Sequence, residues 1–197
     1  MLKVIVFICC LVTLGCSQKQ EDFFFKTLDS SRTGIDFNNQ ITNTPGLNIL
    51  NYLYFYNGGG VCAGDFNNDG FVDLYFTSNL QADKLYLNQG NFKFKDITTI
   101  SGINNSDGWT NGVTSVDINN DGLLDIYISK TSDFLNLNGH NLLFVNQGIK
   151  DGVPSFKELS QMYALDISAF STQAVFFDYD LDGDLDLFLL NHSVYPN

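Results

Sequence analysis

The chain has 197 residues, of which 44% are hydrophobic, and it carries 22 acidic against 10 basic side chains. Its formal net charge of −12 argues against nucleic acid as a partner, because binding to nucleic acid needs a basic surface. Eleven of the acids fall within three nine-residue windows, which favours local cation sites over a general solubilising charge. The 18 Phe and 9 Tyr residues favour strands.

The N-terminal segment is typical of a secretion signal. One Lys precedes an apolar run from Val4 to Leu14, which is too short to span a bilayer as a mature helix. The Gly15-Cys16 pair resembles the end of a bacterial lipoprotein signal, in which Cys16 becomes the lipid-bearing first residue. Thr13 departs from that pattern, which prefers a large aliphatic residue there, so a plain cleaved signal with an incidental Cys16 is the alternative.

We therefore expect residues 1–15 to be a signal peptide and residues 16–24 an anchor and linker. The resemblance implies an exported protein attached to a membrane through a lipid at Cys16. It also implies a location at the outer membrane or cell surface of a Gram-negative bacterium.

Cys9 and Cys10 would leave with the signal, so Cys62 alone would remain unmodified in the folded part. Because no intramolecular disulfide is then available, a bound metal is the usual substitute. Cys62 itself lies in an apolar run and is expected to be a small core residue.

An internal repeat organises the rest of the chain. The segments DFNNDGFVD (65–73), DINNDGLLD (117–125) and DYDLDGDLD (178–186) align without gaps, and their starts lie 52 and 61 residues apart. These spacings fit a four-stranded propeller blade with loop insertions better than a helical solenoid.

The residues around each nonapeptide extend the repeat to four predicted strands. An apolar stretch precedes each nonapeptide, and a strand-like run follows it. An Asn-Gln-Gly turn at 88–90 and 146–148 then ends a third strand, and a Phe-Lys pair at 94–95 and 156–157 begins a fourth. The strand after each nonapeptide is apolar on both faces, as a blade packed between two neighbours requires.

The predicted fold class is therefore all-β, an incomplete β-propeller of about two and a half four-stranded blades. We expect the first blade over residues 58–108, the second over 109–170 and a partial third over 171–197. Residues 25–57 resemble the fourth strand of a unit and are expected to close the propeller. Their partner strands would then lie beyond Asn197, so the chain looks truncated, and its open edges would be liable to pair.

Each nonapeptide has the pattern of an oxygen cage for a hard cation. Positions 1, 3, 5 and 9 present side-chain oxygens, position 6 is Gly for a sharp turn, and position 7 offers its backbone carbonyl. The candidate ligands are Asp65, Asn67, Asp69, Phe71 and Asp73 in the first loop; Asp117, Asn119, Asp121, Leu123 and Asp125 in the second; and Asp178, Asp180, Asp182, Asp184 and Asp186 in the third. The third loop replaces Asn by Asp180, and its extra charge is expected to bind a cation most strongly if the loop is equally rigid.

Calcium is the metal that this pattern favours. Carboxylates about 5 Å apart repel by roughly 3 kcal/mol per pair at an effective dielectric constant near 20, and a divalent cation reverses that balance. Zinc is excluded because no Cys or His lies in the loops. An EF-hand would need Glu at position 12 and a helix after it, whereas Phe76, Ile128 and Leu189 stand there within predicted strands. Three solvated Asp turns that bind nothing are the remaining alternative.

These blocks, such as NGGGVCAGDFNNDGFVDLYFTSN (57–79), resemble the FG-GAP or VCBS repeat family, whose blades are related to the integrin α-subunit propeller. The resemblance is strongest to long bacterial members that are similar to cartilage acidic proteins. It implies up to three structural Ca²⁺ ions that pin the link between the first and second strands of each blade. It also implies a binding, adhesion or scaffold module with a protein or glycan ligand.

No catalytic motif is evident. His140 and His192 lie near no nucleophile in the sequence, and Gly58-Gly59-Gly60 lacks the Lys and helix of a phosphate loop, so a tight strand entry is the better interpretation. The alternative function is an N-terminal fragment of a carbohydrate-active propeller enzyme, a calcium-dependent lyase or a hydrolase. Tyr56, Trp109 and Phe170 precede the first strands of the blades and would form either an aromatic ligand rim or packing between blades.

Overall fold

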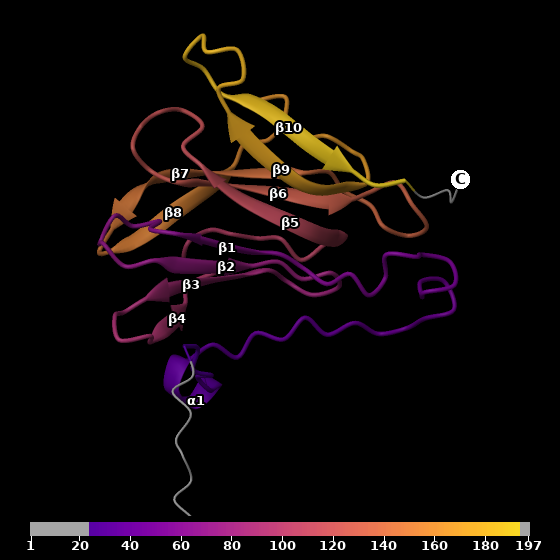
Figure 1. The fold of residues 1–197 in the computed structure, drawn as a ribbon, viewed down its shortest axis with the longest axis horizontal. Helices are drawn as coiled ribbons and strands as arrows, with labels where there is room; N and C mark the ends of the chain where they lie inside the picture. The colour runs from indigo at the N-terminus through magenta and orange to yellow at the C-terminus, as the bar shows by residue number, and fades with distance from the viewer. Residues whose placement is uncertain (1–23, 194–197) are drawn as a thin grey trace, which may run out of the picture.

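The computed structural model describes residues 24–193, and its regular secondary structure consists almost entirely of antiparallel strands (Figure 1). The expected signal peptide and Cys16 lie outside the described residues. Strands β1 (Val61–Gly64), β2 (Asp73–Phe76), β3 (Lys84–Asn88) and β4 (Phe94–Asp96) form the first sheet in that order. Strands β5 (Trp109–Val116), β6 (Asp125–Thr131), β7 (Leu142–Lys150) and β8 (Val153–Glu158) form the second, and β9 (Ser171–Phe177) pairs with β10 (Asp186–Asn191).

These sheets are two complete propeller blades and the first half of a third, which we call blades 1, 2 and 3. In each, the nonapeptide connects the first strand to the second in the same register. The last residue of the first strand pairs with the Asp at position 9, as Gly64 with Asp73, Val116 with Asp125 and Phe177 with Asp186. The expected all-β class and the incomplete propeller are confirmed.

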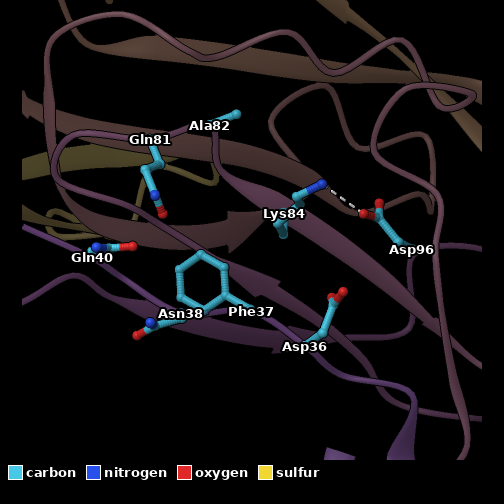
Figure 2. A pocket seen from close by; sticks show the side chains of 8 residues that line it. All are labelled: Asp36, Phe37, Asn38, Gln40, Gln81, Ala82, Lys84 and Asp96. Carbon is cyan, nitrogen blue, oxygen red and sulfur yellow. Dashed lines mark hydrogen bonds and ion pairs between the residues drawn. The ribbon is translucent and has the colours of Figure 1, made fainter.

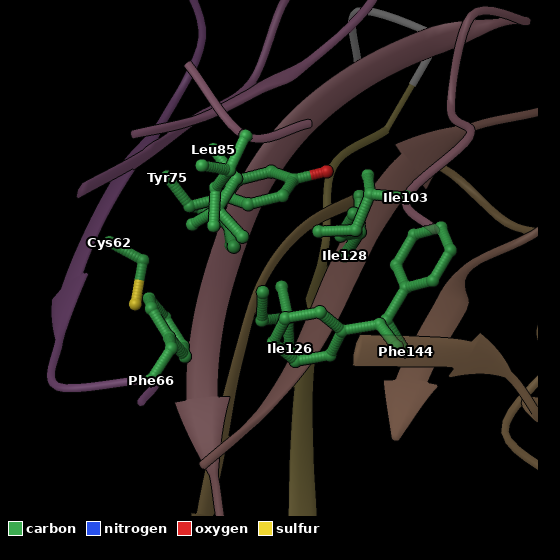
Figure 3. Close-up of a cluster of buried hydrophobic side chains, with 11 residues drawn as sticks. Cys62, Phe66, Tyr75, Leu85, Ile103, Ile126, Ile128 and Phe144 are labelled. Carbon is green, nitrogen blue, oxygen red and sulfur yellow. The ribbon is translucent and has the colours of Figure 1, made fainter. Parts of the chain in front are cut away.

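The blades stack face to face through their apolar second strands. Between blades 1 and 2, Tyr75 lies in one buried cluster with Ile126 and Ile128 (Figure 3). Between blades 2 and 3, Tyr127 lies in a second cluster with Leu187 and Leu189 packed against it. In β6, a strand that is apolar on both faces is stable because each face packs on a neighbouring blade.

The outer face of blade 3 is open in the described residues. Phe188 stands at the repeat position of Tyr75 and Tyr127, yet it is 61% exposed whereas both tyrosines are 0% exposed. Val175, Phe177 and Leu190 on the same two strands are also exposed. The expected double burial of the second strand therefore holds where a blade lies on either side and not where one face is open.

Close approach of another backbone explains two glycines, Gly59 just before β1 and Gly112 within β5. A Cβ on Gly59 would overlap the Thr77 carbonyl oxygen, and a Cβ on Gly112 would overlap the Thr172 carbonyl oxygen of the next blade. These residues are therefore glycine because another backbone lies in contact with them, and the expectation of a tight strand entry at Gly58-Gly59-Gly60 is confirmed.

The N-terminal segment differs from expectation, since it contains the short helix α1 (Ser30–Thr33) and no strand between residues 24 and 60. A strand needs a partner for its backbone groups, and residues 24–60 pair with no strand of the described chain. The segment nonetheless lies against β4 of blade 1 in the way that the chain just after β4 lies against β8 of blade 2. A Cβ on Gly34 would approach the Phe94 carbonyl oxygen to 2.6 Å, as one on Gly102 would approach that of Phe156 to 2.8 Å.

Past α1 the chain covers the outer face of blade 1. Phe37 stacks on Phe76 with ring centroids 5.1 Å apart, and the Tyr86 hydroxyl donates to Asp36 at 2.8 Å. The chain continues into a cluster of buried aromatic side chains that includes Tyr52, Phe55 and Trp109. Within residues 24–193, no helix has the length and hydrophobicity that a membrane span requires.

Candidate metal centres

The first acidic loop is closed by hydrogen bonds from its own backbone to the Asp at position 1. Asp65 accepts the N–H of Asp69 at 3.0 Å through one carboxylate oxygen and that of Gly70 at 2.8 Å through the other. Asp69 in turn accepts the N–H of Phe71 at 2.8 Å. Gly70 has φ of 87°, which favours glycine, so the invariant Gly at position 6 serves the turn.

The same contacts recur in the other two loops. The N–H groups of positions 5 and 6 reach Asp117 at 3.0 and 2.9 Å in the second loop, and they reach Asp178 at 3.2 and 3.1 Å in the third. Position 7 donates to the carboxylate of position 5 in each, at 2.9 Å to Asp121 and 3.1 Å to Asp182. One backbone conformation is therefore repeated three times, and the candidate ligands take equivalent places in it.

Position 9 anchors each of the first two loops to the third strand of its blade, whereas in the third loop Asp186 accepts the Tyr179 N–H at 2.8 Å. Asp73 accepts the Phe66 N–H at 3.0 Å and the Asn88 N–H at 2.8 Å, and Asp125 accepts the Ile118 N–H at 2.9 Å and the Asn146 N–H at 2.7 Å. Burial raises the pKa of Asp73 to about 6 and raises the pKa of Asp125, with the other loop carboxylates adding to both shifts. A nearby cation would favour the ionised form of both groups.

The side chain at position 3 of the first loop has an acceptor atom that no described residue satisfies. Asn67 is 6% exposed, and its amide nitrogen donates to Asp69 and to the Gly152 carbonyl oxygen, each at 2.9 Å. Its Oδ1 atom is buried and has no hydrogen-bond partner. An unpaired buried acceptor costs about 1–3 kcal/mol, and a cation at the centre of the loop would satisfy it.

The third loop brings three carboxylates together. One oxygen each from Asp178, Asp180 and Asp186 lies within 4.8 Å of the others, and among the described residues this is the sole such acidic group. The loop is the most exposed of the three, and a hydrogen bond with Asp182 raises the pKa of the Asp184 carboxyl. This is the electrostatic strain between like charges that a divalent cation relieves.

The first loop also contacts the next blade. Asn68 donates to the Gly122 carbonyl oxygen in the second loop at 3.1 Å, and Asn146 of β7 donates to the Phe66 carbonyl oxygen at 3.0 Å. The sequence predicted only turns at the Asn-Gln-Gly segments. It did not reveal that the backbone N–H groups of Asn88 and Asn146 donate to the carboxylates at position 9. Their recurrence at the same place after each loop was the available signal.

The arrangement suits ion binding and holds no evident catalytic group. The ligand set consists of oxygen atoms, and the loops are fixed by backbone hydrogen bonds. A surface pocket of about 440 Å³ lies elsewhere, on the outer face of blade 1, and is lined by residues such as Phe37, Gln40 and Lys84 (Figure 2). There the Lys84 amine pairs with Asp96 at 2.7 Å on an exposed surface.

The repeated blade and its acidic loop define a β-propeller repeat module. The family model for the FG-GAP-like repeat matches residues 65–128, which span the first two acidic loops, and the resemblance seen in the sequence is confirmed. The chain is similar to cartilage acidic protein 1 of Mus musculus and of Homo sapiens, with 32% identity over 139 residues to each. These matches cover 69% of this chain and 21% and 20% of the two relatives, so the chain spans about a fifth of their length.

Proposed function

We propose that each of the three acidic loops binds one Ca²⁺ ion and that the protein is a calcium-stabilised binding module. The observation that carries the calcium proposal is the buried, unpaired Oδ1 of Asn67 inside a loop whose backbone is reproduced twice more. Position 3 is the place at which a cation-binding loop presents a side-chain oxygen to its ion. The acidic triplet Asp178, Asp180 and Asp186 supports the same proposal for the third loop.

The role of the ions in this proposal is structural. Asn67 and Asn68 each donate a hydrogen bond to blade 2, at 2.9 and 3.1 Å, and Asn67 is also a proposed ligand. An ion bound to the side-chain oxygen of Asn67 would leave the side-chain N–H groups of Asn67 free to donate to Asp69 and to the Gly152 carbonyl oxygen. A bound ion would therefore stabilise the loop and the contact between two blades at once.

Binding, rather than catalysis, is the activity that we infer for the module. The relatives and the family model support a propeller-type module, and eleven of the 22 acidic side chains lie in the three loops. We propose that the protein is exported and lipid-anchored through Cys16, as the N-terminal sequence indicates. Its partner would be a protein or a glycan outside the cytoplasm.

Thermal unfolding of the full chain in calcium and in a chelator tests the calcium proposal. We expect a lower melting temperature in the chelator, because an ion that binds only the folded state stabilises it by mass action. The variants Asp69→Ala, Asp121→Ala and Asp182→Ala should each lose part of the calcium-dependent increase. Asp133→Asn is the matched control, since Asp133 is an exposed acid outside the loops with φ of 57°, which Asn tolerates. An equal melting temperature with and without calcium would contradict the proposal.

A further inference from the structure

A cavity of about 270 Å³ lies where the first strands of the three blades, β1, β5 and β9, begin; we call these the inner strands. It is lined by Gly58–Gly60 before β1, by Asn111 and Gly112 of β5, and by Thr172 and Gln173 of β9. Gly60, Gly112 and Gln173 each lie five residues before position 1 of an acidic loop. The cavity is therefore at the opposite end of the inner strands from the acidic loops and is independent of the proposed calcium sites.

One wall of the cavity is aromatic. Tyr54 and His192 lie ring against ring with centroids 4.0 Å apart, and both line the cavity. Two hydrogen bonds fix His192. Its Nε2 atom lies 3.1 Å from the Tyr52 hydroxyl, and its backbone N–H donates to the Phe170 carbonyl oxygen at 3.0 Å. Burial lowers the pKa of His192, which favours the neutral form of its ring.

The rest of the cavity wall includes two residues with side-chain amides, Asn111 and Gln173. Asn111 donates its amide hydrogens to the Thr131 hydroxyl and the Ser171 carbonyl oxygen, at 2.9 and 2.7 Å. Gln173 donates its own to the Thr114 hydroxyl and the Val113 carbonyl oxygen, at 3.1 and 3.4 Å. Both amide nitrogens are thus engaged by the protein, and no described residue donates to either amide oxygen. These oxygens are fixed acceptors for hydroxyl groups of a ligand.

The lining limits the charge of the ligand. Around this cavity the described residues include no Asp, Glu, Lys or Arg, so a charged ligand would lose its hydration without a partner of opposite charge. The Asn57 side-chain amide, for which the described residues provide no hydrogen-bond partner, and the Tyr54 hydroxyl add groups that can donate or accept. A ligand with one apolar face for a ring and several hydroxyl groups matches both walls.

We propose that this cavity binds a neutral pyranose sugar, with one sugar face on Tyr54 and its hydroxyl groups donating to Asn111 and Gln173. The proposal deepens the binding function by naming a ligand class and a place for it. It does not depend on the acidic loops beyond the need for a folded protein. Glycine at positions 58–60 is consistent with it, since side chains there would meet neighbouring backbone at Gly59 and Gly60.

Saturation-transfer NMR of the full chain in calcium tests the proposal, with glucose, galactose, mannose and N-acetylglucosamine as probes. We expect transfer to at least one of these sugars. Tyr54→Ala should weaken its binding about three- to tenfold, which corresponds to roughly 0.7–1.4 kcal/mol for the loss of one aromatic contact. Tyr54→Phe should retain most of the binding. Gln173→Ala removes one acceptor from an exposed strand position and should weaken binding without unfolding the sheet.

The matched control is Tyr56→Ala, which removes a 59% exposed tyrosine two residues away that does not line the cavity. Absence of transfer to all four sugars from folded protein would overturn the proposal, as would equal losses in Tyr54→Ala and Tyr56→Ala. Tyr54-dependent transfer to tetramethylammonium in place of a sugar would also overturn it and would identify a cation site. Calcium uptake measured on the same samples separates failure of this proposal from failure of the calcium proposal.

Discussion

Asn146 in blade 2 donates its side-chain amide to the Phe66 carbonyl oxygen in the acidic loop of blade 1, at 3.0 Å. Asn88, its equivalent in blade 1, donates to Val72 of its own blade at 2.8 Å. Asn146 is 2% exposed and therefore links two blades within a buried interface. The acidic loop is thus held from both sides, by its own backbone and by the following blade.

Asn146→Ala should lower the free energy of unfolding by about 1–3 kcal/mol, because it leaves the Phe66 carbonyl oxygen buried without this donor. Urea unfolding in saturating calcium measures the change. Asn88→Ala is the control and should cost less, since its side chain makes no hydrogen bond to another blade among the described residues. Equal losses of unfolding free energy in Asn146→Ala and Asn88→Ala would show that the hydrogen bond between the blades contributes nothing to stability.

Asp83 predicts a dependence of stability on pH. Burial raises its pKa from 3.8 to about 7, although the Ser78 N–H, Asn105 and Tyr75 all donate to it. Between these pH values the folded protein holds a proton that the unfolded chain has released. The contribution of the protonated group to stability is therefore complete below about pH 4 and is lost as pH rises towards 7, by on the order of 4 kcal/mol.

Asp83→Asn should flatten that dependence. The equivalent residue of blade 2 is Asn141, which donates to the Tyr127 hydroxyl at 3.0 Å and accepts the Lys130 N–H at 2.8 Å, so the fold already accommodates Asn at this position. Urea unfolding from about pH 4 to 7 in excess calcium, compared between wild type and variant, isolates Asp83 from the loop carboxylates. Parallel curves of unfolding free energy against pH for the wild type and Asp83→Asn would contradict the raised pKa of Asp83.

Gly112→Ala should destabilise the contact between blades 2 and 3. Its Cβ would overlap the Thr172 carbonyl oxygen and the Gln173 side chain, and overpacking of this kind costs about 1–3 kcal/mol. Gly46→Ala is the control, since the nearest atom to its Cβ would be the Asn136 amide nitrogen at 3.8 Å. A thermal melt of each variant measures the difference, and equal melting temperatures would count against the close approach.

Leu181→Asn should stabilise the third loop. Leu181 has φ of 64° and is 86% exposed, whereas Asn68 and Asn120 take the same position of the other loops with φ of 52° and 57°. A leucine in this left-handed region costs about 1–2 kcal/mol, which Asn largely avoids. We expect tighter calcium binding at this loop, measured by calorimetric titration. Unchanged or weaker binding would show that the conformation of position 4 does not limit affinity.

The strands and the acidic loops could be predicted from the sequence because both depend on local patterns. Apolar runs bounded by turn residues gave β1 to β10 to within a few residues, and the repeat gave the loops. The contacts between blades could not be predicted, because the partners of Asn67 and Asn146 lie 85 and 80 residues away in the chain. Nor could α1, since residues 25–35 match a fourth strand by sequence but find no strand to pair with.

Equilibrium dialysis of the folded full chain against calcium, with the bound ions counted per molecule, tests the central claim most directly. Three equivalent loops predict about three bound ions, and about two for each of Asp69→Ala, Asp121→Ala and Asp182→Ala. Folded protein that binds no calcium, or variants that bind as many ions as the wild type, would contradict the account.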